Sequence, residues 1–380
     1  MIGRRHQVAL ALTALLAAAA ACTNQEREGT AASANPAPPA AQGFTLVASG
    51  DVLPHASVVE RAGFDAGGNG YNFRPMLSGI EPVVSRADVA LCHLEMVHEG
   101  DRNGHPASTA PPQIAWGLAA TGYDSCSTAS EHALDDGDSF QRTLAAMDQA
   151  GLRHTGTARN ESEARSVPML KAGPAKVAHL SYTYAGDQHP LGAGPAWAVN
   201  QVDEQRMIAD ARAARKAGAD VVVVSVHWGT AWQDAPDQLQ LTLAQRLTAS
   251  QSAGRPDIDL ILGTGAHVPQ AYEKVNGTWV VYGMGDQVAG EMYNDQGARD
   301  SRGDESTIGR FTFAPPARPG ARWEITRAEA LPQVFDLDAG RALDLGQAIA
   351  GGAELAAARD RIQDVVLSRG AAKDGLLIER

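Results

Sequence analysis

The chain of 380 residues is poor in aromatic residues, cysteine and lysine. Aromatic side chains make up 5% of the sequence and there are 3 cysteines, which excludes the small secreted scaffolds that depend on many disulfides. Lysine accounts for five of the 32 basic residues, and with 44 acidic residues the formal net charge is −12. The sequence has no stripe of Lys and Arg to follow a phosphate backbone. We therefore do not expect nucleic acid as a partner.

The remaining composition is that of an ordinary globular protein. Hydrophobic residues make up 44% and charged residues 20%, with 39 Gly and 20 Pro, which excludes a wholly disordered, collagen-like or coiled-coil chain. At 380 residues the chain is long enough for one large domain, or for one and a half, with a sizeable buried core.

The long hydrophobic run of the sequence lies at its N-terminus. A basic pair, Arg4 and Arg5, precedes an apolar run of small residues that ends at Cys22. This pattern predicts a secretory signal peptide over residues 1–21, which is too short for a comfortable membrane span. Small residues before a cysteine are also what a bacterial lipoprotein signal peptidase recognises, so we expect export and a lipid anchor on Cys22 at the outer face of the membrane. Because Ala19 stands where leucine is usual, secretion without a lipid remains the alternative.

Composition divides the exported chain into three parts. Residues 22–42 are rich in Ala, Pro, Ser and Thr, which predicts a flexible tether after the lipidated cysteine. Residues 43–300 form the predicted main domain. Residues 301–380 read as a β-rich C-terminal extension that ends in a helix. The sequence leaves open whether this extension is a separate unit or continues the same sheets.

Within the main domain, short apolar runs alternate with stretches of helical periodicity. Strands separated by helices predict an α/β fold. Asn276-Gly277 between two apolar runs predicts a β-hairpin. The apolar runs are FTLVASGD, ADVALCHLE, YDSCSTAS, AKVAHLSYTY, ADVVVVSVHWG and DIDLILGTGAHV, and the helical stretches are 137–151, 203–217 and 236–253.

Acidic residues and histidines gather at the ends of the predicted strands. In open α/β sheets, ligands bind at the carboxyl ends of the strands, and carboxylates with imidazoles are the usual ligands of Zn, Mn or Fe. We therefore predict a metal site built from Asp51, Glu95, His227 and His267. In strand order, the polar strand ends are Asp51 with His55, His93 with Glu95, Glu131-His132 with Asp135, His227, and His267.

Some polar residues have a simpler structural interpretation. His179 alternates within an apolar run and is expected to be a hydrogen-bonded core histidine. We expect three histidines in polar segments to be exposed: His98, His105 and His154. A second group of acidic residues is interpreted as the cap of the following helix: Asp135, Asp136 and Asp138.

Cys92 and Cys126 remain after the predicted anchor cysteine. Both lie in strand-like apolar runs. In an exported protein they could pair, but buried free thiols are the interpretation that we favour from the sequence.

Six segments of the sequence, taken in order, resemble the bacterial capsule-synthesis and poly-γ-glutamate biosynthesis family called CapA. The resemblance extends from about Gly43 to Gly290. The family is similar to the calcineurin-like metallophosphoesterases, which implies two mixed sheets sandwiched between helices and a dinuclear metal site at the strand ends. The segments are GDVLPH, ADVALCHLE, GYDSCSTASEHALDDG, GLRHTGTARNESEA, VVVSVHWG and DLILGTGAHVPQAYEKVNGTWVVYGMGD.

The resemblance implies a role for each site residue. Asp51 and Glu95 would bind metal, with Glu95 bridging, while His267 completes the first metal and His227 binds the second. One or two divalent ions, Mn, Zn or Fe, are the implied cofactor. His132 would protonate the leaving oxygen.

Asp135 would orient His132, the acid. Four positions of the sequence depart from the family pattern. Glu131 stands where Asn is usual, Ala231 where Glu is frequent and His93 where Asn is more usual. Glu131 can still donate a metal-binding oxygen, but Gly265, where a histidine is common, has no side-chain ligand. We therefore expect the first metal site to be complete and the second weakened. A Gly265→His change would restore a ligand if the glycine needs no positive φ angle.

Two functions are consistent with these features. One is a surface-anchored, CapA-type metallophosphatase-like protein that hydrolyses or transfers a phosphoester or an anionic polymer. The other is a non-catalytic protein that binds a polyanion, or assists its assembly, through a degenerate metal cleft. The negative net charge repels polyanions, so such binding would need bound metal or local arginines. Whether the chain is an enzyme stays open at this stage.

Overall fold

A computed structural model describes residues 42–95, 111–135, 139–185, 190–294, 296–318 and 320–379. The predicted signal peptide, the anchor at Cys22 and nearly all of the tether lie outside the described residues, as do His98, His105, Asp136 and Asp138. In the described part of the chain, no helix combines the length and the apolar character needed to cross a membrane.

The first sheet contains nine strands. In chain order they are β1 (Phe44–Val52), β2 (Val89–Leu94), β3 (Ser125–Ser127), β4 (Arg153–Thr155), β13 (Asp286–Val288), β14 (Glu305–Ala314), β15 (Glu324–Asp336), β16 (Arg341–Asp344) and β17 (Leu376–Ile378). The spatial order is β16-β15-β14-β1-β2-β3-β4, with β13 paired to β1 and β17 to β15. Strands β1 to β4 are parallel and β14 is antiparallel to β1, so the sheet is mixed.

The second sheet contains six strands in the order β11-β12-β10-β7-β6-β5. Their bounds are β5 (Met169–Ala172), β6 (Ala175–Thr183), β7 (Val221–His227), β10 (Leu260–Thr264), β11 (Tyr272–Val275) and β12 (Thr278–Val281). Side chains from both sheets share one apolar core, in which Phe44 and Leu46 of β1 join Val177, Val223 and Leu260 of the second sheet. The two sheets therefore pack face to face.

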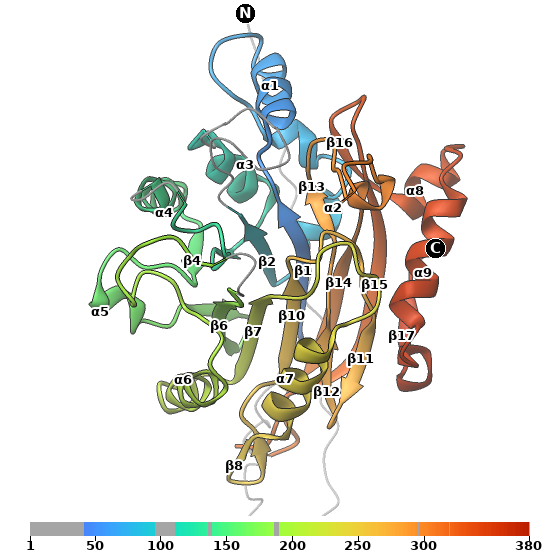
Figure 1. Ribbon diagram of the computed structural model, residues 1–380. Helices are drawn as coiled ribbons and strands as arrows, with labels where there is room; N and C mark the ends of the chain where they lie inside the picture. The colour runs from blue at the N-terminus through green and yellow to red at the C-terminus, as the bar shows by residue number, and fades with distance from the viewer. Residues whose placement is uncertain are drawn as a thin grey trace, which may run out of the picture. The chain divides into compact units, whose positions relative to one another are not determined.

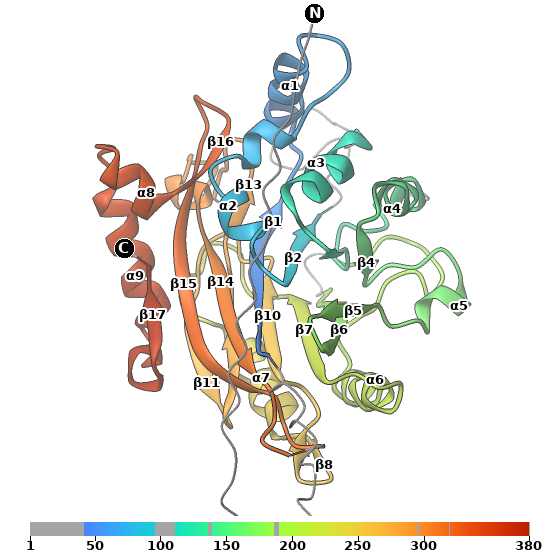
Figure 2. The same cartoon turned by 180° about the vertical axis from the view of Figure 1, so that it is seen from behind.

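Helices cover the outer faces of both sheets (Figures 1 and 2). The first sheet carries α1 (Ala56–Asp65), α2 (Glu81–Val84), α3 (Gln113–Thr121) and α4 (Ser139–Ala150). The second carries α6 (Glu204–Lys216) and α7 (Gln238–Ala249). The helices α8 (Leu345–Ala350) and α9 (Ala356–Leu367) run along β15. The short elements are α5 (Glu161–Ala164), β8 (Gln251–Ser252), β9 (Arg255–Pro256), and the 3-10 turns Arg74–Leu77, Ser301–Asp304 and Ala371–Asp374. The prediction of two mixed sheets between helices is confirmed.

The predicted hairpin and the C-terminal strands have clear places in the sheets. Asn276 and Gly277 connect β11 to β12 with φ angles of 48° and 80°, as a two-residue turn of type I′ requires. Strand β14 pairs with β1 from Phe44 to Ser49. The strands after residue 300 therefore extend the first sheet.

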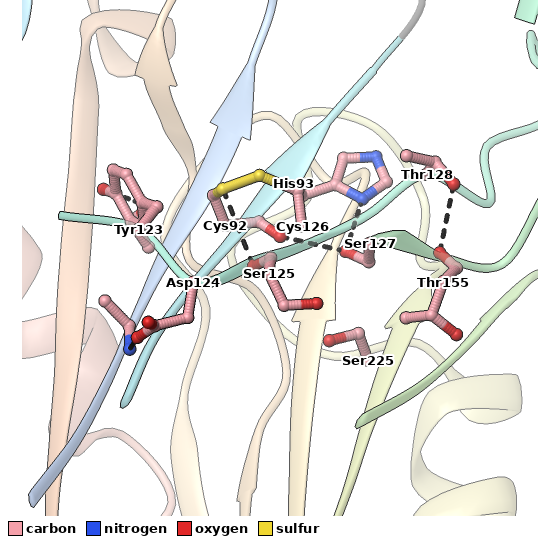
Figure 3. Close-up of a disulfide and its surroundings, with 12 residues drawn as sticks. Cys92, His93, Tyr123, Asp124, Ser125, Cys126, Ser127, Thr128, Thr155 and Ser225 are labelled. Carbon is pink, nitrogen blue, oxygen red and sulfur yellow. Dashed lines mark hydrogen bonds between the residues drawn. A yellow bond between two sulfur atoms is a disulfide. The ribbon is translucent and has the colours of Figure 1, made fainter. Parts of the chain in front are cut away.

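Cys92 and Cys126 form a disulfide (Figure 3), so the expectation of free thiols was wrong. The two residues face each other in the β2–β3 ladder, and their Cα atoms are 4.4 Å apart. The spacing of Cys92 and Cys126 along the sequence does not predict the disulfide, because the disulfide forms only where β2 and β3 are neighbours at this register.

Two histidines outside the metal centre have defined partners. His179 is fully buried and hydrogen-bonds Ser125 Oγ and Ser225 Oγ, each at 2.9 Å, which confirms a core histidine. His154 was expected to be exposed, but its side chain is 9% exposed and lies within 3.2 Å of Asp148. Its place in β4 explains the difference.

Candidate metal centre

Strands of both sheets end at one place, and their parallel register brings the polar residues together. In the first sheet, Asp51 lies opposite His93 of β2 and opposite Asp286 of β13. In the second, His227 ends β7 opposite Thr264 of β10. The backbone N–H of Gly265 donates to Asp51 Oδ2 at 2.9 Å. This bond joins the strand ends of the two sheets.

One group of potential metal ligands contains Asp51, His93, Glu95 and His227, and all four are buried. One ligand atom of each lies within 4.8 Å of the others. Asp51 Oδ1 is 3.8 Å from His93 Nε2 and 4.0 Å from His227 Nδ1. The two imidazole rings stack with centroids 4.7 Å apart. Two nitrogens and two oxygens suit Zn, Mn or Fe.

A second group shares Asp51 and adds His267 and Asp286, again with ligand atoms within 4.8 Å. His267 Nδ1 lies 3.2 Å from Asp286 Oδ1. His267 has a φ angle of 62°, in the left-handed region that is costly for a residue with a Cβ. Residues with such strained φ angles cluster at functional sites. In this conformation the imidazole of His267 lies beside Asp286.

The polar atoms that face one another in this centre lack hydrogen-bond partners. Within the described residues, no partner exists for Asp51 Oδ1, His93 Nε2, Glu95 Oε2 or Asp286 Oδ2, and each is buried. A buried polar atom without a partner costs free energy. Four such atoms converging on two neighbouring places fit cations as the missing partners. The residues present therefore fit a pair of divalent ions.

Without a cation, two histidines of the centre, His227 and His267, are stabilised in their charged form by neighbouring carboxylates. Burial opposes a charged His227, but the carboxylates of Glu131, Glu95 and Asp51 outweigh it and raise the pKa to about 10. Burial likewise opposes a charged His267, and Asp286 raises its pKa to about 10. A metal ion needs neutral imidazoles, so its binding must displace these protons.

Burial is the largest cause of the pKa shifts of the ligands His93 and Asp51. Burial lowers the pKa of His93 well below its usual range, and His227 adds to the effect. Burial raises the pKa of Asp51 to about 7, with further contributions from Asp286 and Glu95 that His227 opposes. His93 is thus a neutral ring already suited to metal binding.

Glu131 contacts the centre through His227. Its Oε2 lies 2.9 Å from His227 Nε2. Burial of Glu131 disfavours its ionised form, but the neighbouring charge of His227 prevails and lowers its pKa. The role of Glu131 as a metal ligand stays a prediction. Among the described residues it forms an ion pair with His227 and belongs to neither group of potential metal ligands.

His132 and Asp135 lie at the more open side of the centre. Their side chains are 43% and 38% exposed, and His132 Nδ1 lies 2.7 Å from Asp135 Oδ2. Ser130 connects this loop to the ligands, because its Oγ donates to Glu95 Oε1 at 2.9 Å and accepts from the His132 N–H at 3.1 Å. Burial opposes a charged His132, but Glu95, Glu131 and Asp135 raise its pKa.

The structure brings four of the five predicted ligands, Asp51, Glu95, His227 and His267, into one centre and adds two residues, His93 and Asp286. Asp286 has no counterpart in the sequence predictions. It follows the short run VVYGMG and is the first residue of β13, and its position after that run was its only signal. His93 was placed beside Glu95 but given no ligand role. The resemblance implied Glu95 as the bridge, whereas the carboxylate common to both groups is Asp51.

The expectation for Gly265 needs correction. Its φ angle is 92°, and a Cβ there would lie 2.9 Å from His227 Nε2. Gly265 and His267 are therefore not alternate residues of an extended strand. The His227 ring occupies the space that a side chain at 265 would need, so Gly265→His is not expected to add a ligand.

Comparison with known proteins adds a family and distant structural neighbours. The family model described as "Bacterial capsule synthesis protein PGA_cap" matches residues 45–291. The "Probable polyglutamine synthesis accessory protein" of Mycobacterium tuberculosis is 28% identical over 250 residues, covering 60% of this chain and 62% of that protein. The "Capsule biosynthesis protein CapA" of Bacillus anthracis is 25% identical over 257 residues, 64% of this chain and 59% of its own length. The chain thus spans about three fifths of these relatives.

The solved structures that align with this chain include two nucleotidases. The NAD nucleotidase of Haemophilus influenzae aligns over 90% of this chain and 57% of its own, with 12% identity and a TM-score of 0.44. A 5'-nucleotidase precursor from Thermus thermophilus aligns over 85% and 59%, with 15% identity and a TM-score of 0.43.

Proposed function

The chain belongs to the bacterial capsule synthesis family PGA_cap, and from this premise we propose that it is a metal-dependent hydrolase or transferase of capsule or poly-γ-glutamate synthesis. Its substrate is a phosphoester or an anionic polymer. One observation carries the proposal: two groups of ligands share the buried carboxylate of Asp51. A carboxylate shared in this way could bind two neighbouring ions at once, as two-metal hydrolytic sites need.

Two groups of residues would bind the metal ions. Asp51, His93, Glu95 and His227 would hold one ion, and Asp51, His267 and Asp286 the other. Two divalent ions, when bound, polarise a phosphoryl or carbonyl centre and supply hydroxide at neutral pH.

His132 is positioned to protonate the leaving oxygen. The neighbouring carboxylates of Glu95, Glu131 and Asp135 raise the pKa of His132 and so favour its protonated ring. Asp135 accepts from Nδ1–H, so the ring is oriented and Nε2–H is the proton to be donated. A general acid of this kind contributes about 10²–10⁴-fold to a rate.

Replacing His132 by Gln tests this role. A poor leaving group needs a proton and a good one does not, so turnover of an alkyl phosphodiester should fall about 100-fold or more and that of bis(p-nitrophenyl) phosphate much less. Steady-state rates on both esters, with metal content measured alongside, give the comparison. Asp135→Asn is the matched variant and should show the same trend more weakly. Equal losses on both esters would exclude an acid role for His132.

Polyanion binding without turnover is the second candidate. It is favoured by two departures from the pattern that the resemblance implies. Gly265 has no side-chain ligand where a histidine is common, and Ala231 stands where Glu is frequent. It keeps the metal centre and removes the role of His132. A wild-type protein that holds metal, retains poly-γ-glutamate on a column and hydrolyses neither ester would support this function over the first.

The proposal includes the location of the protein. The small residues before Cys22 support export and a lipid anchor at the outer face of the membrane, with secretion as the alternative. Expressed in a bacterial host, the Cys22→Ser variant should move from the membrane fraction to the soluble exported fraction, because it cannot be acylated. Fractionation followed by immunoblotting measures this. An unchanged membrane share for Cys22→Ser would rule out the lipid anchor.

A further inference from the structure

Ser127, the neighbour of His93 across the β2–β3 ladder, contacts the Nδ1 atom of the His93 ring. Ser127 Oγ lies 2.8 Å from His93 Nδ1 and 3.3 Å from the carbonyl oxygen of Cys92 (Figure 3). A hydroxyl has one proton, and both contacts are satisfied when Ser127 donates it to Cys92 O and accepts from Nδ1–H. Nδ1 then carries the ring proton, and Nε2 presents a lone pair toward Asp51 Oδ1, 3.8 Å away. This is the tautomer that a metal ion needs.

The ladder that keeps Ser127 in place is very short. It consists of three registered pairs, of which Cys92–Cys126 is the central one and His93–Ser127 the next. A shift by one residue would turn His93 to the opposite face and separate it from Ser127. The disulfide prevents such a shift, because it joins the central pair covalently.

The disulfide and the metal ligand lie on opposite faces of the sheet. Cys92 and Cys126 belong to the apolar cluster under the helices, whereas His93 and Ser127 face the centre. The two cysteines are 3% and 0% exposed. The bond is therefore shielded from reductants in the folded protein, and it acts as a permanent part of the site that forms in the oxidising exported environment.

We propose that Ser127 and the Cys92–Cys126 disulfide form one positioning unit, which presents Nε2 of His93 to the ion held with Glu95 and His227. The unit sets the metal affinity of that group and leaves the group of His267 and Asp286 unaffected. The inference rests on the proposed metal centre. It goes further in assigning a function to the disulfide and in making the two metal sites respond differently.

Cobalt(II) titration of the whole mature chain tests the proposal, because the visible absorption of bound cobalt reports its ligands separately from activity. The wild type should bind two ions. Cys92→Ala with Cys126→Val, a pair chosen to refill part of the space, should weaken one site about 10–100-fold and the other by less than about 3-fold. Ser127→Ala should weaken the same site, and Ser127→Thr should restore it because the hydroxyl returns.

Two controls separate positioning from lost stability. Ile362→Ala in α9 removes a fully buried side chain remote from the centre and should lower the melting temperature without changing either affinity. In a His93→Ala background, loss of the disulfide should cause no further weakening, because the group that it positions is gone.

The possible results are distinct. If the wild type binds two ions and the variant without the disulfide binds both with unchanged affinity, or weakens both equally, the positioning role is refuted while the metal centre stands. A wild type that binds no cobalt would refute the metal centre and the positioning unit together.

Discussion

Replacing Asp51 by Asn should remove both metal ions from the protein. Asp51 is the one residue common to the two groups of ligands, and an amide oxygen without charge is a poor substitute for a carboxylate between two cations. We expect metal affinity to fall more than about 100-fold at both sites, beyond the loss usual for an outer-shell partner. Elemental analysis after dialysis measures the retained ions. Changes at His93 or His267 should each affect one site.

The same variant should be less sensitive to pH than the wild type when both are free of metal. Burial raises the pKa of Asp51 to about 7, so the folded chain binds this proton more tightly than the unfolded chain does. Stability should therefore be lost as the pH rises from about 4 to about 7. Asp51→Asn has no such proton and should avoid a loss of up to about 4 kcal/mol.

Urea unfolding in EDTA at pH 5 and pH 8 measures this difference. Asp338→Asn, on the surface, is the matched control and should follow the wild type at both pH values. If Asp51→Asn keeps two ions, Asp51 is not the shared ligand. If metal-free wild type and variant show the same pH dependence, folding does not raise the pKa of Asp51.

Adding a side chain at Gly265 should damage the centre. Its φ angle of 92° disfavours any Cβ, and that atom would lie 2.9 Å from His227 Nε2. For Gly265→Ala we expect about 1–3 kcal/mol from the backbone and about 1–3 kcal/mol from overpacking, together with weaker metal binding as His227 shifts. Gly265→His should be at least as damaging. Thermal unfolding and metal titration measure the two effects.

Gly67→Ala separates the two causes. Gly67 also has a positive φ angle, 66°, but a Cβ there would meet nothing within 4 Å. It should show the backbone cost alone and keep its metal. Gly265→Ala with the stability of Gly67→Ala and full metal occupancy would contradict the contact with His227.

The strands and the main ligands could be predicted because they depend on local patterns. The apolar runs that end in Asp51, Glu95, His227 and His267 are strands in the structure, and parallel strands place their ends together whatever the details of packing. The hairpin at Asn276 is equally local, since two positive φ angles suit only a few residue pairs.

The features that could not be predicted depend on which strands are neighbours. The disulfide requires β2 beside β3 at a register that joins Cys92 to Cys126. Asp286 enters the centre because β13 returns to pair with β1 at Asp51. The His227 ring fills the space beside Gly265 because β7 pairs with β10 at Thr264. None of these relations leaves a mark on the spacing of residues along the chain.

The most direct test of the central claim is a crystal structure of the mature chain soaked with Mn or Zn, with anomalous scattering recorded at the metal edge. We expect two anomalous peaks, one in contact with His93, Glu95 and His227 and the other with His267 and Asp286, and both in contact with Asp51. A single peak, or none at these ligands, would contradict a centre that holds two ions.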